Sequence, residues 1–353
     1  MTVKRIPIAI LGATGAVGQR MIQLLANHPW FEIAVLTGSD RTIGRPYGEL
    51  VRWILDDKPP AHIANMIVQP TDKVADVALA LSALPTDAAK QYEPVWAAHT
   101  AVCSNASAYR MTADIPLVIP EVNPEHVNMI DDQRKQRGWR GALVTNPNCS
   151  VIGIAMALKP IYDAVGLTHV HAATLQAVSG AGYPGVASLD IIDNIVPNIA
   201  NGTEEEKIET EPGKILGSYQ VGSIHHATTR ISAQVTRVPV IDGHTALLSV
   251  QSAQGITSED AVRLYETWQA PALVRSLPSA PTQAIVLHTH PERPQPRRDR
   301  DLGNGMSVSV GRIRACTINE LRMVVLSHNT IRGAAGGAIL NAELLAATGY
   351  TSK

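Results

Sequence analysis

A glycine-rich turn near the start of the chain constrains the fold more than any other feature. An apolar run at 6–11 has the length of a buried strand, the letters GATGAVG follow at 12–18, and apolar residues then recur at helical spacing over 17–26. A strand that passes through such a turn into a helix aims backbone amides at one place, where a phosphate can bind. The glycine spacing is GxxGxxG, so the usual GxGxxG fingerprint is only partly met.

The first part of the chain continues as strands alternating with helices. Strand candidates lie at 31–36, 74–84, 99–104, 117–119 and 143–145, separated by helical or loop stretches. Short strands that alternate with helices form a parallel, doubly wound sheet. We therefore predict an α/β chain with a Rossmann-type N-terminal domain.

The pattern changes at about residue 166. Strand candidates now follow one another, and several alternate apolar and polar residues, as a sheet with one covered face does. They lie at 169–178, 230–240, 245–251, 283–288, 306–315 and 321–327. This predicts a second, α+β domain with a mostly antiparallel sheet at 149–328. The segment 329–348 is rich in Ala and Gly and reads as a helix that packs back on the first domain, which we place at 1–148 plus 329–353.

The composition is that of a globular protein without a strong overall charge. The 353 residues are 45% hydrophobic and 17% charged, and the net charge of −1 gives no attraction toward nucleic acid or anionic lipid. Aromatic residues make up 4% of the chain, too few for a base-stacking surface. No apolar run reaches the ~18 residues of a membrane span, and the start shows no cleavage pattern. The three cysteines lack metal-type spacing. We expect no metal, no nucleic-acid or membrane partner, and a cytoplasmic location.

The glycine-rich turn and the tip of the following strand form the candidate cofactor site. An NAD enzyme usually carries an acid at that tip to hold the ribose hydroxyls, whereas Thr37 stands here. Ser39 and Arg41 suit a 2′-phosphate and favour NADP, while Asp40 keeps NAD open and Arg41 also fits a solvated loop charge. The cofactor contacts expected here are Gly12, Ala13, Thr14, Gly15, Ala16, Val17, Thr37, Ser39 and Arg41.

Cys149 is the candidate nucleophile. It follows Asn-Pro-Asn and precedes an apolar, helix-forming run at 150–158, which Pro160 should kink or end. The positive end of a helix dipole stabilises a thiolate, the reactive form of cysteine. A thiolate can attack an aldehyde, and the adduct can pass hydride to a nicotinamide and become a thioester. The competing interpretation is a buried core cysteine.

His244 is the candidate proton-transfer group. It ends the letters RVPVIDGH at 237–244, where Gly243 allows the backbone to turn after a strand. An imidazole titrates near neutral pH, as general acid–base catalysis requires. A structural histidine at a strand end fits this position equally well.

Three basic residues could bind an anionic substrate. They are Arg110, Lys214 and Arg237, and the guanidinium of Arg237 could hold a carboxylate through two hydrogen bonds. Each alone also fits an ordinary surface charge. A second glycine-rich loop, SGAGYPG at 179–185, lacks the GK[ST] ending of a P-loop, so its amides could face a substrate but do not indicate nucleotide hydrolysis.

Taken together, the motifs resemble the aspartate-semialdehyde dehydrogenase family. The matching segments follow the family's order and are GATGAVG (12–18), SNASAYRM (104–111), NPNCS (146–150), LQAVSGAGYPG (175–185), EPGKILG (211–217), RVPVIDGH (237–244) and NTIRGAAGGAILNAE (329–343). NPNCS and the Arg-to-His spacing are specific, whereas the glycine motifs are not. The segments TTRISAQVTRVP and PQPRRDRDLGNGMSVSVGR look like the archaeal and fungal branch.

The resemblance implies a reaction and a role for each candidate residue. The reaction would be the NADPH-dependent reduction of 4-phospho-L-aspartate to L-aspartate 4-semialdehyde and phosphate, toward lysine, threonine and methionine. Cys149 would form the thioester, His244 would move protons, and the second domain would be catalytic and would build a homodimer or homotetramer. The resemblance further implies that Gln176 orients the intermediate, that Arg237 binds the substrate carboxylate and that Glu211 binds its amino group. Arg110 and Lys214 would bind phosphate. Further substrate contacts would come from Asn148, Ser179 and Gly180, and cofactor contacts from Gly182 and Asn329.

Other activities remain open at this point. Malonyl-CoA reductase shares the scaffold and the thioester chemistry but needs room for coenzyme A where phosphate would bind. N-acetyl-γ-glutamyl-phosphate reductase matches less well around Cys149 and His244. A non-catalytic NADP-binding protein would need neither of these residues, and a cysteine hydrolase would have no use for the cofactor turn.

Overall fold

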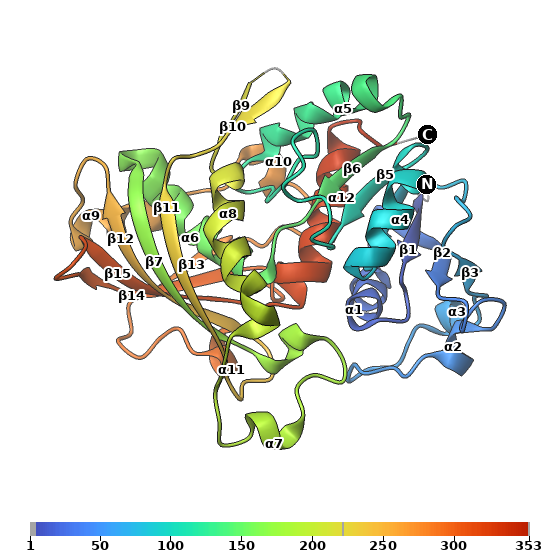
Figure 1. Ribbon diagram of the computed structural model, residues 1–353, viewed down its shortest axis with the longest axis horizontal. Helices are drawn as coiled ribbons and strands as arrows, with labels where there is room; N and C mark the ends of the chain where they lie inside the picture. The colour runs from blue at the N-terminus through green and yellow to red at the C-terminus, as the bar shows by residue number, and fades with distance from the viewer. Residues whose placement is uncertain (1–4, 221, 352–353) are drawn as a thin grey trace.

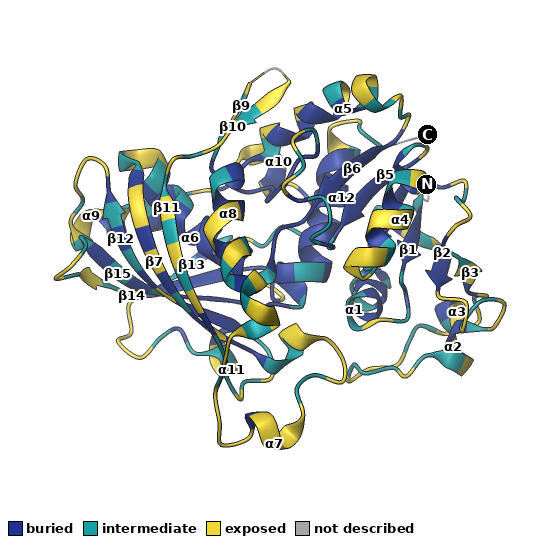
Figure 2. Ribbon diagram, in the orientation of Figure 1, coloured by how far each residue is buried: buried dark blue, intermediate teal, exposed yellow. Residues whose placement is uncertain are grey.

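Two sheets, each with its own hydrophobic core, organise the computed structural model, which describes residues 5–220 and 222–351. In Figure 1 the two sheets lie in separate lobes, and helix α8 (Thr203–Ile215) runs between them. Buried residues follow the strands of both sheets, whereas α7 (Ser188–Ile191) and the outer side of α8 are exposed (Figure 2).

The first sheet is parallel throughout and has the strand order β3-β2-β1-β4-β5-β6. Its strands are β1 (Ile6–Leu11), β2 (Phe31–Gly38), β3 (Gln69–Pro70), β4 (Leu79–Ser82), β5 (Ala101–Ser104) and β6 (Ala142–Thr145). The chain winds outward from β1 in both directions, so a crevice opens at the carboxyl ends of β1 and β4, where such sheets bind ligands. The doubly wound Rossmann-type fold predicted from the sequence is confirmed.

Helices flank this sheet, and the end of the chain returns to it. The helices are α1 (Ala16–Leu25), α2 (Tyr47–Leu50), α3 (Ala61–Ala64), α4 (Thr86–Ala97), η1 (Pro124–Asn128) and α5 (Met129–Arg137). The last helix, α12 (Gly336–Ala347), packs against β4, β5 and α1. A short π-helical segment, η4 (Ile331–Ala335), precedes it and packs against α6 (Cys149–Val165).

The second sheet has seven strands in the order β13-β14-β15-β12-β7-β11-β8. Its strands are β7 (Leu167–Gln176), β8 (Val196–Pro197), β11 (Arg230–Arg237), β12 (His244–Ser252), β13 (Ile285–His288), β14 (Val308–Ala315) and β15 (Leu321–Ser327). The pairs β7–β11 and β13–β14 are parallel and the other neighbours are antiparallel, so the prediction of a mostly antiparallel sheet is confirmed. Helix α6 covers one face of this sheet and fills its core.

Shorter elements complete the second lobe. They are η2 (Val178–Ala181), η3 (Ile199–Gly202), the hairpin of β9 (Ser218–Gln220) and β10 (Ser223–His225), α9 (Ser258–Thr267), α10 (Ala272–Arg275) and α11 (Pro296–Asp299). Within the described ranges, no helix has both the length and the apolar character needed to cross a bilayer.

Two local predictions differ from the structure, and both involve proline. Residues 117–119 form no strand and contribute only a single bridge from Leu117 to Thr145. Prolines stand at 116 and 120, and a proline has no N–H to donate to a ladder. Of the kink or end predicted at Pro160, the end is wrong, because helix α6 continues through Pro160 to Val165. One lost backbone hydrogen bond is tolerated because the helix is buried on most sides.

Candidate functional site

The glycine-rich turn folds as a tight cradle at the carboxyl end of β1. Gly12 has φ +75°, and a Cβ added to it would lie 2.9 Å from the Ala83 carbonyl oxygen. A Cβ added to Gly18 would lie 2.5 Å from the Gly12 oxygen, so both positions require glycine. A Cβ added to Gly15 would make only an ordinary contact, at 3.6 Å from the Gly12 oxygen, and helix α1 has no side-chain cap at its N-terminus. Amides at this helix end can therefore receive a phosphate.

Two cavities flank this turn. One, of about 410 Å³, is lined by Gly12, Thr14 and Gly15 together with the tip of β2 and the segment after β4. The other, of about 250 Å³, lies between Ala16 of α1 and the loop 178–185 of the second lobe. The backbone amides of the turn lie between these two cavities and can donate hydrogen bonds to a pyrophosphate. The residues present therefore fit an extended dinucleotide.

The expected cofactor residues differ in how they face this space. Ser39 and the acid Asp40 line the cavity beside the turn. Thr37 is fully buried beneath it and accepts a hydrogen bond from the Thr71 hydroxyl at 3.0 Å. Arg41 is exposed and is not among the residues that line this cavity. On the other side of the turn, Gly182 has φ +72° and open space around its Cα.

Cys149 is the first residue of α6, and Asn148 caps that helix. The Asn148 side-chain oxygen accepts hydrogen bonds from the amides of Ser150 and Val151, at 2.9 and 3.3 Å. The π-helical segment closes over the cysteine, because a Cβ added to Gly333 would lie 2.7 Å from the Cys149 Cβ. The thiol is thus half-buried at a capped helix end between the two lobes.

The sequence led us to expect a thiolate at this helix end, and the free protein does not hold one. Burial raises the pKa of Cys149 to about 12, and the carboxylate of Glu204 adds to this rise. The positive charges of Arg110, Arg237 and Lys207 oppose the rise without overcoming it. The cost of removing a charged sulfur from water therefore outweighs the helix dipole.

His244 is a buried, neutral proton donor. It begins β12 with 3% of its surface exposed, and its Nδ1 accepts a hydrogen bond from the Ala177 amide at 3.0 Å. The ring proton therefore sits on Nε2, which has no hydrogen-bond partner among the described residues. Burial, followed by the charges of Arg237 and His328, lowers the pKa of His244 to about 3.

Arg237 links the thiol and the imidazole. It ends β11, and its Nη1 donates to the Ala177 carbonyl at 2.8 Å and to the Gln176 side chain at 3.4 Å. Its charge acts on the pKa of both Cys149 and His244, and a Cβ added to Gly180 would lie 2.7 Å from its Nη1 and 3.0 Å from Nε2 of His244. The thiol, the imidazole and the guanidinium therefore share one site.

The inner face of α8 supports the cap of Cys149. Glu211 accepts hydrogen bonds from the Asn148 amide at 2.7 Å and from Arg110 Nη1 at 2.9 Å. Glu204 accepts from the Asn148 side-chain amide at 2.8 Å. Lys214 is 1% exposed and donates to the carbonyls of residues 110, 112 and 115 at 2.8, 2.7 and 2.6 Å. All three of its N–H donors are used, so in this conformation Lys214 holds the segment that carries Arg110.

Asn329 joins the two loops around the site. Its Oδ1 accepts from the Gly243 amide at 2.9 Å, and its Nδ2 donates to the Ser179 hydroxyl at 2.8 Å. Just beyond it, Arg332 forms a buried two-pronged pair with Glu121, with both N–O distances at 2.7 Å. This pair anchors the π-helical segment that packs on Cys149.

Comparison with known proteins shows the family to which the chain belongs. Residues 7–130 match the NAD binding domain of the semialdehyde dehydrogenases, and residues 158–332 match their dimerisation domain. An aspartate-semialdehyde dehydrogenase from Archaeoglobus fulgidus is 49% identical over 343 residues, which cover 97% of this chain and 98% of that protein. The chain belongs to the aspartate-semialdehyde dehydrogenase family.

Other members and neighbours of the family resemble the chain over its whole length. A crystal structure of aspartate semialdehyde dehydrogenase with NADP from Candida albicans has a TM-score of 0.89 and 40% identity, covering 98% of this chain and 99% of that one. A malonyl CoA reductase (NADP) from Metallosphaera sedula is 40% identical over 98% of each chain. The family, the fold and the oxidoreductase class predicted from the motifs are confirmed.

Sequence reasoning missed two charged residues near Cys149. Glu204 and Lys207 both act on the pKa of Cys149, and they contact each other at 3.2 Å. A signal was present, because Glu204, Glu211 and Lys214 recur at the spacing of one helix face. This spacing indicates a functional face only if that face of the helix is buried. The burial is evident from the packing of α8 between the lobes and not from the sequence.

Proposed function

We propose that this chain is a cytoplasmic enzyme that reduces 4-phospho-L-aspartate to L-aspartate 4-semialdehyde and phosphate with NADPH. The observation that carries the proposal is the single buried site in which Cys149, His244 and Arg237 meet beside a dinucleotide-binding turn. Membership of the family and the NADP of the Candida albicans structure support the substrate and the cofactor.

In the first step, the Cys149 sulfur attacks the acyl carbon of the substrate. The sulfur–carbon bond forms, the bond to the phosphate oxygen breaks, and the departing phosphate takes the thiol proton. His244 is not the acceptor at Nε2, because that nitrogen already carries a proton. Positive charges from Arg110, Arg237 and Lys207 favour the developing thiolate at this moment.

In the second step, the thioester on Cys149 is reduced. Bound NADPH would supply the hydride for this reduction. The neutral His244 donates from Nε2 to the carbonyl oxygen as negative charge develops there. Collapse of the adduct breaks the carbon–sulfur bond and releases the aldehyde. The hydroxyl proton returns to Nε2 of His244, and a proton from water restores the Cys149 thiol, so each turnover consumes one proton. A low pKa keeps this imidazole neutral and able to donate over the physiological range.

The substrate's own charges would be met by residues around this pair. Among the residues that the structure describes, Arg237 makes hydrogen bonds only from Nη1, which leaves donors at Nε and Nη2 for a carboxylate. Arg110 would bind phosphate, and Lys214 would support it through the 110–115 segment. Glu211 would bind the amino group, Gln176 would orient the intermediate, and Asn148, Ser179 and Gly180 would complete the pocket. Gly182 and Asn329 would lie toward the nicotinamide.

We further propose that the chain forms a homodimer or homotetramer through its second domain. Residues 149–328 would supply this interface, and residues 1–148 plus 329–353 would bind the cofactor. The uncovered face of the second sheet exposes Leu175 and Leu247, and the segment around α7 exposes Leu189 and Ile192. Exposed apolar side chains of this kind favour a subunit contact.

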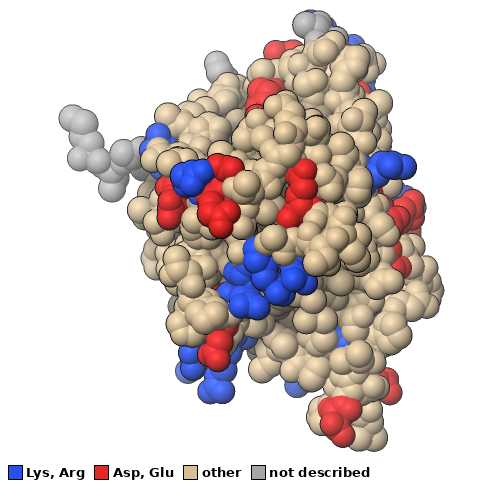
Figure 3. Space-filling view, turned by 90° about the vertical axis from the view of Figure 1, so that its left-hand side faces the viewer, with Lys and Arg blue, Asp and Glu red and all other residues tan. Residues whose placement is uncertain are grey.

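A charged patch lies at the end of this domain. Three arginines lie together on β14 and β15, namely Arg312, Arg314 and Arg322. Loss of hydration, followed by the positive charges of Arg322 and Arg312, lowers the pKa of Arg314. Figure 3, which looks onto this end of the molecule, shows basic side chains gathered near the centre with acidic side chains beside them. Neighbouring patches of opposite charge can pair across a two-fold axis.

The test is a reverse-direction assay with aspartate semialdehyde, phosphate and NADP⁺, in which NADPH formation is followed by absorbance. We expect turnover with the wild type, none with Cys149→Ala, and wild-type rates with Cys316→Ala, which removes a thiol outside the site. Turnover by Cys149→Ala would refute the nucleophile. Replacing phosphate by coenzyme A discriminates the rival, because a malonyl-CoA reductase would use the thiol acceptor instead.

A further inference from the structure

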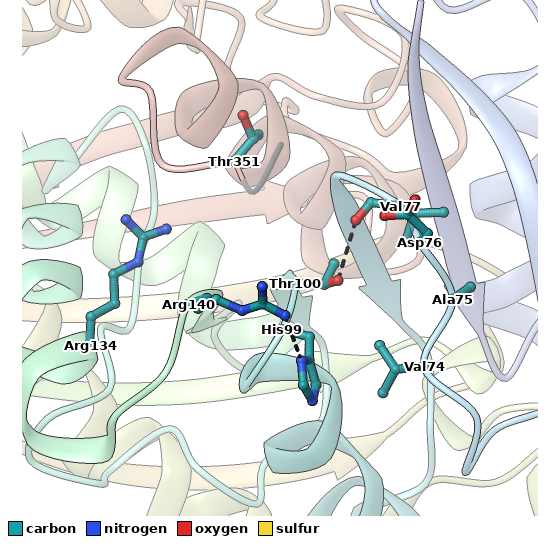
Figure 4. Close-up of a pocket in the computed structure, with 9 residues that line it drawn as sticks. All are labelled: Val74, Ala75, Asp76, Val77, His99, Thr100, Arg134, Arg140 and Thr351. Carbon is teal, nitrogen blue, oxygen red and sulfur yellow. Dashed lines mark hydrogen bonds between the residues drawn. The ribbon is translucent and has the colours of Figure 1, made fainter.

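A cationic cavity lies on the far side of the cofactor domain from the candidate active site. It has a volume of about 640 Å³ and is lined by Val74, Ala75, Asp76, Val77, His99, Thr100, Arg134, Arg140 and Thr351 (Figure 4). These residues precede β4, β5 and β6 or follow α12, so they lie at the amino edge of the parallel sheet. The glycine-rich turn and Cys149 lie at the opposite, carboxyl edge.

Two arginines of this cavity have no acidic partner among the described residues. Arg134 and Arg140 form no ion pair there, whereas Arg137, midway between them in sequence, pairs with Asp114. Asp76 is the one acid among the lining residues. Both residues line the cavity from different elements, Arg134 from α5 and Arg140 from the turn before β6 (Figure 4).

Three contacts hold Arg134, and one contact orients the exposed Arg140. Arg134 donates from Nε to the Gly141 carbonyl at 2.9 Å and from Nη2 to the Tyr350 carbonyl at 3.0 Å, and it lies over the Tyr350 ring. No residue in the described ranges 5–220 and 222–351 accepts a hydrogen bond from Nη1, so this group can donate to a ligand. Arg140 contacts His99 Nδ1 at 3.2 Å, and a guanidinium can only donate. The His99 proton is therefore on Nε2.

We propose that this cavity binds a small organic anion, whose carboxylate or phosphate group is held by Arg134 and Arg140. Guanidinium groups that approach from two directions match the oxygens of such a group. The apolar wall of Val74, Ala75 and Val77 and the volume of about 640 Å³ leave room for an organic body, more than an inorganic ion needs. The carboxylate of Asp76 can accept a hydroxyl or ammonium group of the same ligand.

This ligand would act apart from the substrate. Each of β5 and β6 has four residues, which separate the two edges of the sheet by roughly 13 Å. At the carboxyl edge the Asn146 amide donates to the Ser104 carbonyl at 2.7 Å, and the Asn146 carbonyl accepts from Arg110 Nε at 2.9 Å. The two strands thus connect the cavity to a residue of the candidate active site, so the site is suited to a regulatory ligand.

Calorimetric titration of the NADP⁺-saturated protein tests the site without any turnover. The probes are citrate, which offers carboxylates, and glycerol 2-phosphate, which offers a phosphate. We expect at least one probe to bind with a dissociation constant of about 1 mM or tighter. Arg140→Gln should weaken that binding about tenfold or more, because a charge-assisted pair of hydrogen bonds is lost. Binding of citrate alone identifies a carboxylate site, and binding of glycerol 2-phosphate alone identifies a phosphate site.

The matched control is Lys135→Gln, which removes a positive charge from α5, the helix that carries Arg134, without altering the lining. Its binding should equal that of the wild type. The proposal is overturned if neither probe binds, if Arg140→Gln binds as tightly as the wild type, or if both variants weaken binding equally. Arg140→Gln without a probe should keep its dehydrogenase activity, so failure of this site and failure of the proposed reaction are distinguishable.

Discussion

At the scale of single residues, the site depends on where protons reside. Both reacting side chains are uncharged in the free protein, because burial raises the pKa of Cys149 and lowers the pKa of His244. The Ala177 amide fixes the imidazole tautomer, and Arg237 supplies the nearby positive charge. Small displacements of these groups should therefore change the chemistry more than the stability.

Gly180→Ala tests this dependence. The new Cβ would lie 2.7 Å from Arg237 Nη1 and 2.9 Å from the His244 ring, so one of them must move. We expect kcat to fall about a hundredfold, as misplacement by about 1 Å can cause, with little change in melting temperature because Gly180 is exposed. Gly213→Ala is the control, since its Cβ would meet nothing closer than 3.5 Å. Equal kcat in both variants would contradict the geometry.

The motifs predicted which residues gather here but not their ionisation. Asn148 and Cys149 could be placed at a helix end from the letters NPNCS, and His244 from its glycine. The thiolate prediction was wrong because desolvation comes from the packing of α6, α8 and the π-helical segment, which no local pattern encodes. The 2′-phosphate contact of Arg41 stays a prediction, because its side chain is exposed and the direction of a loop side chain depends on tertiary contacts.

At the scale of elements, α8 connects the lobes through a buried charged face. The sequence predicted the long strands of both sheets, since their apolar runs and alternation are local signals. It missed α8 as a helix, because an acidic and proline-containing run looks solvated until it is packed. The same packing gives Lys214 a structural task that its charge alone did not indicate.

Lys214→Met tests that task. The substitution leaves three carbonyls without their charged donor, so we expect the free energy of unfolding to fall by at least about 3 kcal/mol. Lys207→Met on the same helix loses one half-buried contact and should cost under about 1 kcal/mol. Urea denaturation measures both. If Lys214→Met is as stable as the wild type but has a raised KM for phosphate, Lys214 binds phosphate directly.

At the scale of the whole molecule, buried neutral histidines make the free energy of unfolding depend on pH. His126 lies under the junction of the two lobes, between Asn123 at 2.8 Å and the Gly217 carbonyl at 3.1 Å. Burial lowers its pKa to about 4, and burial lowers the pKa of His244 to about 3. One histidine belongs to the packing between the lobes and the other to the candidate active site, so acid should weaken both together.

The expected sign follows from proton uptake. Histidines in the unfolded chain titrate near pH 6.5, so they bind protons below that pH. In the folded protein, His126 stays unprotonated until the pH falls to its lowered pKa of about 4. The free energy of unfolding should therefore fall as pH falls from 6.5, with up to about 1.4 kcal/mol per pH unit from each buried histidine. Urea denaturation at several pH values gives this slope. His126→Gln should reduce it by nearly one proton, whereas His62→Gln, on the exposed side of α3, should leave it unchanged. An unchanged slope in His126→Gln would mean that His126 gains its proton in the folded state as readily as in the unfolded chain.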